Sequence, residues 1–79
     1  MSSNNSNGPS QEAINGAIAY GAQEYARRYA AGDPDPDFYV TVLNSDGSNY
    51  ARLRASTGQW YMWVPNSSNF STTASSKPN

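Results

Sequence analysis

Two glycine-containing turns within a run of alternating residues constrain this 79-residue chain more than any other feature. Within each of three short segments, 38–43, 50–55 and 60–64, the residues alternate in character as they do in a β-strand. Asp46-Gly47 lies between the first and second segments, and Thr57-Gly58 lies between the second and third. Asp-Gly is favoured in two-residue hairpin turns of type I′, because both central residues of that turn need positive φ angles. The pattern therefore predicts a three-stranded antiparallel meander.

The register of these strands decides which side chains form the core, because a slip of one residue exchanges the two faces of a sheet. With a two-residue turn in each hairpin, Leu53 pairs with Val40 on one side and with Met62 on the other. Both turns then assign the same residues to one face, which we expect to form the core. This inner face consists of Phe38, Val40, Val42, Ala51, Leu53, Ala55, Trp60, Met62 and Val64.

The opposite face of the predicted sheet is rich in aromatic and basic residues. In the same register Arg54 lies between Tyr39 and Tyr61, and Arg52 lies beside Trp63. A guanidinium over an exposed ring gains about 0.5–1 kcal/mol, so one interpretation is a ladder that only stiffens the sheet. The other is a contact surface, because tyrosine, tryptophan and arginine are enriched at interface hot spots. The candidate partner-binding residues are Tyr39, Tyr50, Arg52, Arg54, Tyr61 and Trp63.

A single helix is predicted over residues 10–31, ahead of the strands. Ser10 stands at the N-cap position, and Gly32 can take the left-handed conformation that ends a helix. The apolar stripe of this helix suits packing on the inner face, and it consists of Ile14, Ala17, Ile18, Gly21, Tyr25 and Tyr29. The predicted fold is thus α+β, with one N-terminal helix packed on a three-stranded antiparallel β-meander in the order α-β-β-β.

Small residues recur every four positions along this helix, at Ala13, Ala17 and Gly21. Such spacing permits a close approach, either of the chain's own sheet or of a helix from a second subunit. Gly16 and Gly21 each cost about 1 kcal/mol relative to alanine inside a helix. We therefore expect something to pack close to both glycines.

Polar sequence flanks the folded part. Residues 1–9 are a Ser/Asn-rich arm that we expect to be flexible, residues 10–65 form the single domain, and residues 66–79 are a Ser/Thr/Asn-rich tail. Phe70 is the single large apolar residue of that tail. Its position indicates a docking point on its own domain or on a neighbour.

The connector from helix to strand has three alternating acids, Asp33, Asp35 and Asp37, as at the start of a calcium-binding loop. Phe38 takes the place of the required glycine, however, and Asn44 that of the bidentate glutamate. We therefore expect no metal site. The acids are expected to keep the first strand soluble as a sheet edge.

Catalysis finds no support in the residue types present. The chain contains neither histidine nor cysteine, which removes the commonest general base, the thiol nucleophile and the usual transition-metal ligands. No glycine motif for phosphate binding is present, and the acids of the helix, the connector and the first turn form no convergent pair. We expect no catalytic residue, no cofactor and no enzymatic activity.

The net charge and the N-terminal residues indicate the expected location of the protein. A formal net charge of −1 and a pI near 4.9 give no bulk attraction to nucleic acid or to anionic membranes. The first seven residues have neither the basic nor the apolar part of a signal peptide. We therefore expect a soluble, cytoplasmic protein.

Two non-catalytic functions remain. The preferred one is protein binding, to its own copies or to a larger partner, through the aromatic–arginine face. The alternative is weak binding of single-stranded nucleic acid through the same face, because rings can stack on bases and arginines can contact phosphates. Protein binding is favoured over nucleic-acid binding, because the whole chain has only five cations to contact phosphates.

The composition as a whole resembles that of small phage accessory proteins. The features that carry the resemblance are a short cysteine-free chain, polar tails and an aromatic sheet. The resemblance implies a virion or assembly subunit or a small inhibitor and, for a phage-encoded chain, association with the virion.

Overall fold

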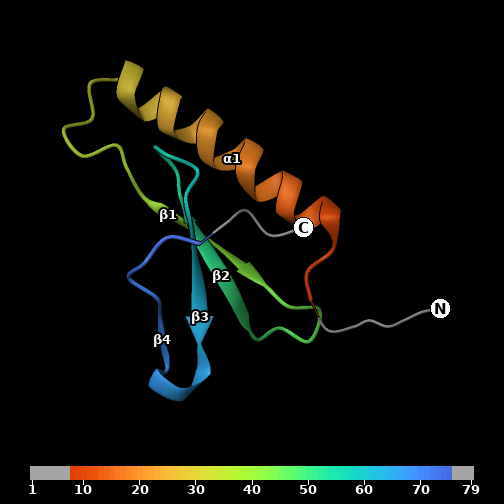
Figure 1. Ribbon diagram of the computed structural model, residues 1–79. Coiled ribbons are helices and arrows are strands. Elements are labelled where there is room, and N and C mark those ends of the chain that lie inside the picture. The colour runs from red at the N-terminus through yellow and green to blue at the C-terminus, as the bar shows by residue number, and fades with distance from the viewer. Residues whose placement is uncertain (1–7, 76–79) are drawn as a thin grey trace.

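One helix lies across a four-stranded antiparallel meander in the computed structural model, which describes residues 8–75 (Figure 1). Helix α1 spans Gln11–Ala30, and the sheet order is β1-β2-β3-β4. The predicted α+β fold is confirmed, with one strand more than the three expected. The strands are β1 (Tyr39–Leu43), β2 (Asn49–Arg54), β3 (Trp60–Val64) and β4 (Asn69–Phe70).

Both ends of α1 carry the caps that the sequence predicts. The Ser10 side chain accepts a hydrogen bond from the Ala13 N–H at 3.0 Å. At the other end Gly32 has a φ of +80°, and its N–H donates to the Tyr29 carbonyl while the Asp33 N–H donates to the Arg28 carbonyl. These two bonds form a Schellman motif, which satisfies carbonyls that the helix leaves free. The predicted bounds, 10–31, agree with the structure to within one residue.

The first hairpin has the predicted pairing but a different turn. Val40 pairs with Leu53 and Val42 with Ala51, as expected. The turn, however, is centred on Ser45 and Asp46, because the Gly47 N–H donates to the Asn44 carbonyl at 3.0 Å. A bulge in the ladder next to Val42 compensates for this offset of one residue, so the core register is retained.

The second hairpin is shifted by two residues from the predicted register. Leu53 pairs with Trp60 rather than with Met62, and Ala51 pairs with Met62. The loop contains four residues, 55–58, because the Arg54 N–H bonds the Gln59 carbonyl and Gly58 takes a φ of +74°. A shift of two residues keeps each side chain on its predicted face, since the side-chain period of a strand is two.

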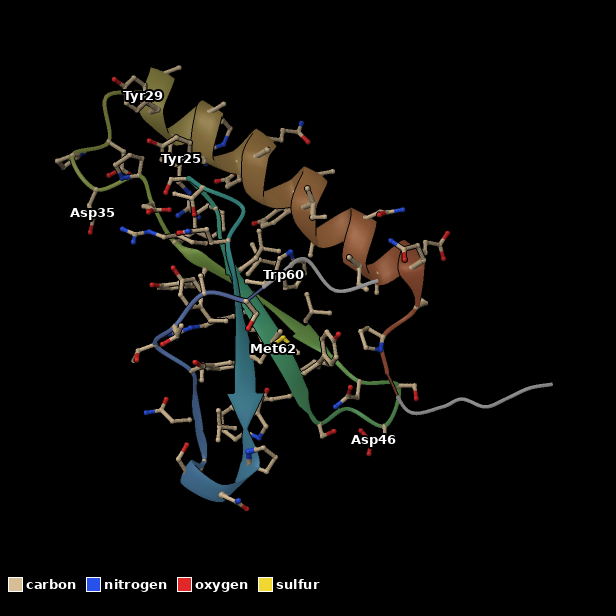
Figure 2. The ribbon with its side chains drawn as sticks, in the orientation of Figure 1. Tyr25, Tyr29, Asp35, Asp46, Trp60 and Met62 are labelled. Carbon is tan, nitrogen blue, oxygen red and sulfur yellow. The ribbon has the colours of Figure 1, made fainter. Side chains whose placement is uncertain are left out.

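The core lies between α1 and the inner face of the sheet. Trp60, at 2% exposure, points from β3 into this layer beneath the helix, with Met62 further along the strand (Figure 2). Gly21 of α1 lies so close that an added Cβ would contact Val40 and Ala55, whereas Gly16 faces open space. The expectation of close packing therefore holds for Gly21 and is wrong for Gly16. The buried residues are Ile14, Ala17, Val42, Ala51, Leu53, Ala55 and Trp60.

Several residues of the predicted core are less buried than expected, among them Val64, Tyr29 and Phe38. Val64 is 37% exposed, because the register shift carries it beyond the part of the sheet that α1 covers. Tyr29 is 69% exposed in the last turn of the helix, beyond the sheet (Figure 2). Phe38 is half-buried, with the Tyr20 ring 6.1 Å away and the Arg28 guanidinium over its face at 4.1 Å.

The chain continues as structure beyond Pro65, where the sequence predicts only a tail. Pro65 ends β3 as predicted, and a short 3₁₀ helix, η2 (Pro65–Ser67), turns the chain into β4. This hairpin lies at the end of the molecule remote from α1 (Figure 1). Beyond β4 the Ser71 and Ser75 N–H groups donate to the Met62 and Trp60 carbonyls, each at 2.8 Å. The free edge of β3 is thereby covered by the chain's own C-terminal segment.

Residues 1–7 and 76–79 lie outside the described residues, and so do the predictions of a flexible arm and of a tail that fall on them. Within residues 8–75 no helix is long and apolar enough to cross a membrane.

Candidate protein-binding face

The candidate site is the sheet face that points away from α1, which we call the outer face. Its residues come from all four strands, because side chains alternate between the two faces along each strand. The large side chains of the outer face are those of Tyr39, Arg52, Arg54, Tyr61, Trp63 and Phe70. Phe70 was predicted as a docking point, and the structure places it on its own domain as part of this face.

Tyr50 does not belong to the outer face, contrary to the prediction. The bulge near Val42 gives β2 one extra residue at this point, so Tyr50 turns toward the inner side and packs against the core. The extra residue of a bulge leaves the regular alternation of the ladder. The other five predicted residues lie together on the outer face.

Arg52 holds the centre of the outer face. Its guanidinium carbon lies 4.1 Å from the centroid of the Tyr39 ring on β1 and 4.8 Å from that of the Phe70 ring on β4. The side chain thus contacts rings from the two edge strands. Its Nε atom is buried without a hydrogen-bond acceptor, the sole buried side-chain nitrogen or oxygen in that state among the described residues. The predicted neighbour was Trp63, but the register shift places Tyr61 opposite Arg52.

Arg54 has a different environment only two residues away. Its Nε donates to the Asp37 carboxylate at 2.6 Å, and the same carboxylate accepts bonds from the Ser56 N–H and hydroxyl. Burial opposes ionisation of Asp37, but the hydrogen bonds from Ser56 and Arg54 outweigh it and lower the pKa of this carboxyl to about 2. The Asp37 hydrogen bond in turn raises the pKa of Arg54. Asp37 therefore anchors the β2–β3 loop, a role that the sequence interpretation missed.

The arginines of the described chain form two groups, those that pair with a carboxylate and one that does not. Arg27 and Arg28 both pair with Glu24, and Arg54 pairs with Asp37. Within residues 8–75 no carboxylate pairs with Arg52, and no acceptor hydrogen-bonds its Nε. Because an arginine carries its charge at any pH a protein meets, this cation is left for solvent or for a partner.

The rings of the outer face contact one another edge to face. Tyr39 and Tyr61 meet at 6.0 Å with an interplanar angle of 84°, and Trp63 meets Phe70 at 4.9 Å and 72°. Such geometry is favourable by about 0.5–1.5 kcal/mol per pair beyond buried area. Tyr39 remains 44% exposed, while Tyr61 and Trp63 are half-buried. The face is therefore an ordered aromatic surface rather than a pocket.

The acids of the connector do not converge on one point. Asp33 accepts a hydrogen bond from the Asp35 N–H at 2.9 Å, whereas Asp37 turns to Arg54. Among the described residues no group of three or more histidine, cysteine or acidic side chains could hold a metal ion.

Comparison of the chain with protein-family models, with curated proteins and with solved structures found no match.

Proposed function

We propose that this protein is a non-catalytic protein-binding module whose outer face contacts a protein partner. The observation that carries the proposal is Arg52, an ordered cation with no carboxylate partner among residues 8–75. Holding an unpaired arginine against two rings costs the domain an unsatisfied Nε. The Nε atom itself is buried, so a carboxylate or carbonyl of a partner would bind the terminal nitrogens of this guanidinium.

The chemistry of the face fits a protein partner. Tyrosine, tryptophan and arginine contribute most to the binding energy at protein interfaces, and they act from rigid, partly desolvated positions. Both Tyr39 and Phe70 restrict the Arg52 side chain, so little rotamer entropy is left to lose on binding. A guanidinium prefers a carboxylate as acceptor. We therefore expect the partner to present an acidic residue or a C-terminal carboxylate toward Arg52.

The finer interpretation as a phage-type accessory protein, a virion or assembly subunit or a small inhibitor, remains a proposal based on composition. It would make the partner either a copy of this chain, a virion protein or a host protein. The outer face is the binding surface in each case.

Single-stranded nucleic acid is the alternative ligand for the same face. In its favour, no carboxylate of residues 8–75 pairs with Arg52, and Tyr61 and Trp63 are half-exposed. Against it, Asp37 neutralises Arg54, and the Trp63 ring already contacts Phe70 edge to face. With one unpaired cation on the face, the salt-dependent part of the affinity would be small. The contacts of the outer face therefore support the protein partner better.

The test is a selection of peptides from a displayed random library on the immobilised full chain. We expect enriched peptides with an acidic residue or a free carboxylate. Their dissociation constants are then measured for the wild type, for Arg52→Met and for the control Arg28→Met, whose guanidinium lies over Phe38 next to α1. Arg52→Met should weaken binding at least tenfold, which corresponds to about 1.4 kcal/mol, and Arg28→Met should leave it unchanged.

Two results would contradict the proposal. One is a selection that enriches no peptide, and the other is equal binding by Arg52→Met and the wild type. An oligothymidine titration, followed by tryptophan fluorescence, runs in parallel. Binding of this oligomer that Arg52→Met abolishes, without any peptide binding, would favour the nucleic-acid alternative.

A further inference from the structure

The two edges of the sheet differ in how much of the chain covers them. At one edge lies β4, a strand of two residues, and beyond it the Ser71 and Ser75 N–H groups bond the carbonyls of β3, so within residues 8–75 this edge offers little strand for pairing. Strand β1 has β2 as its single strand partner within the described chain, and its other side is open. An open edge strand is a template for pairing with another strand.

The direction of the backbone groups in β1 can be read from its two ends. The Phe38 carbonyl accepts a hydrogen bond from the Ala55 N–H, and the Asn44 N–H donates to the Ser48 carbonyl, each at 2.8 Å. Both groups point toward β2. Because backbone directions alternate along a strand, the N–H and C=O groups of the odd-numbered residues point away from β2. These residues are Tyr39, Thr41 and Leu43.

The open edge lacks the charged residues and prolines that often prevent edge pairing. Natural edge strands carry lysine, proline or inward-pointing charges, and β1 (Tyr-Val-Thr-Val-Leu) has none of them. Its β-branched and aromatic residues favour extended structure. Tyr39 and Leu43 are 44% and 47% exposed at this edge. The strand is therefore uncharged, apolar and accessible.

We propose that β1 pairs antiparallel with β1 of a second copy of this chain, with a two-fold axis at Thr41. In this register Thr41 faces Thr41 of the second copy, and Tyr39 faces Leu43. It is the one antiparallel register in which all three outward-pointing residues meet one another. Two sheets would join into one continuous sheet, and their outer faces would lie side by side.

A second copy fits this edge because β1 is complementary to itself. An uncharged strand can face its own copy without repulsion between like charges. The same register places Asp37 of one copy opposite Ser45 of the other, so no two acids meet at the ends of the pairing. The pairing uses the sheet edge and does not depend on the partner proposed for the outer face.

The first test uses the absence of cysteine from the chain. Thr41→Cys places two thiols on the two-fold axis, where opposite Cα atoms about 5.5 Å apart are within disulfide range. Leu43→Cys is the matched control on the same strand, because its two thiols would be separated by about 14 Å along the strands at 3.4 Å per residue. Under mild oxidation Thr41→Cys should give mostly covalent dimer and Leu43→Cys mostly monomer. A mixture of Tyr39→Cys and Leu43→Cys should also cross-link.

The second test uses charge at the axis, with molar mass measured by light scattering after size exclusion. The wild type should show twice the 8.5 kDa of one chain, with little change at high salt, because the pairing is not ionic. Thr41→Lys and Thr41→Glu should each weaken the dimer at least tenfold, and an equimolar mixture of the two should restore it. Circular dichroism of each variant checks that the fold is kept.

Three outcomes would overturn the inference. A wild type that stays monomeric at the highest attainable concentration excludes the dimer. Equal cross-linking of Thr41→Cys and Leu43→Cys places the contact elsewhere. A dimer that forms as tightly in Thr41→Lys and in Thr41→Glu as in the wild type also places the contact elsewhere. These outcomes do not depend on what binds to the outer face.

Discussion

The two faces of the sheet hold their large side chains by different forces. The inner face is covered by α1 and buries Trp60, Leu53 and Ile14 almost completely. The outer face carries no second layer within residues 8–75, and its order comes from ring contacts, cation–π contacts and one ion pair. Burial of apolar area stabilises a fold strongly, whereas each exposed ring, cation–π or ionic contact contributes little. The inner face therefore maintains the fold, and the outer face contributes less to stability.

The largest expected difference between the faces concerns the two tryptophans. Trp60→Ala should destabilise the domain by about 4 kcal/mol, because it leaves a large cavity under α1. A chain of this size has only a few kcal/mol of net stability, so this variant should be largely unfolded. Trp63→Ala is the matched change on the outer face and should cost about 1–2 kcal/mol, since it removes one ring contact and part-buried area. Urea unfolding compares them, and equal losses would contradict the division between the faces.

The next effect concerns Asp37, which accepts hydrogen bonds from Arg54 and Ser56 at the border of the outer face. Asp37→Ala should cost about 2 kcal/mol, because it removes charged hydrogen bonds to Arg54 and to the Ser56 N–H. Asp35→Ala in the same connector is the control and should change the free energy of unfolding by less than about 0.5 kcal/mol. A loss for Asp35→Ala as large as that for Asp37→Ala would contradict the role of the loop anchor.

Acid should weaken the domain through two carboxylates. Hydrogen bonds lower the pKa of Glu24, through Arg27 and then Arg28, and that of Asp37 to about 2 each, from 4.5 and 3.8. Each folded-state pKa lies below the unfolded value, so the stabilisation is complete above about pH 5 and is lost as the pH falls toward 2. Urea unfolding at neutral pH and at acid pH measures this loss. Asp37→Asn should show a smaller acid loss than the wild type, and an equal or larger loss would assign the effect elsewhere.

Much of this architecture can be predicted from sequence, for reasons that particular residues show. The helix was predictable because Ser10 and Gly32 are local signals for its ends. The core face was predictable because alternation survives any even shift of register, as at Leu53 and Trp60.

Loop details were not predictable, because they depend on long-range contacts and on small local choices. The four-residue loop is held by Asp37, which lies 19 residues before Ser56 in the chain. The bulge that turns Tyr50 inward has no distinct local signal. In the C-terminal segment the aromatic residue Phe70 was the one available signal for β4, and it pointed to docking rather than to a strand.

Alanine substitutions at the two helix glycines, Gly16 and Gly21, test how closely α1 packs on the inner face. Gly16→Ala should stabilise the domain by about 1 kcal/mol, because it gains helix propensity in open space. Gly21→Ala should stabilise it at least as much, since the added Cβ would meet Val40 and Ala55 at ordinary contact distances of 3.5 and 3.7 Å. Thermal unfolding of both variants measures these gains. A destabilised Gly21→Ala would mean that α1 lies closer to the sheet than described.

The smallest expected effect belongs to Arg52 and tests the central claim most directly. The measurement is the free energy of urea unfolding of Arg52→Met beside Arg54→Met. Methionine keeps a long side chain on the Tyr39 and Phe70 rings and removes the buried, unsatisfied Nε, so Arg52→Met should change stability by less than about 0.5 kcal/mol. Arg54→Met should cost about 1 kcal/mol, because it leaves Asp37 without its cation. An Arg52→Met variant that loses as much stability as Arg54→Met, or more, would show that Arg52 maintains the fold and would contradict its assignment to a partner.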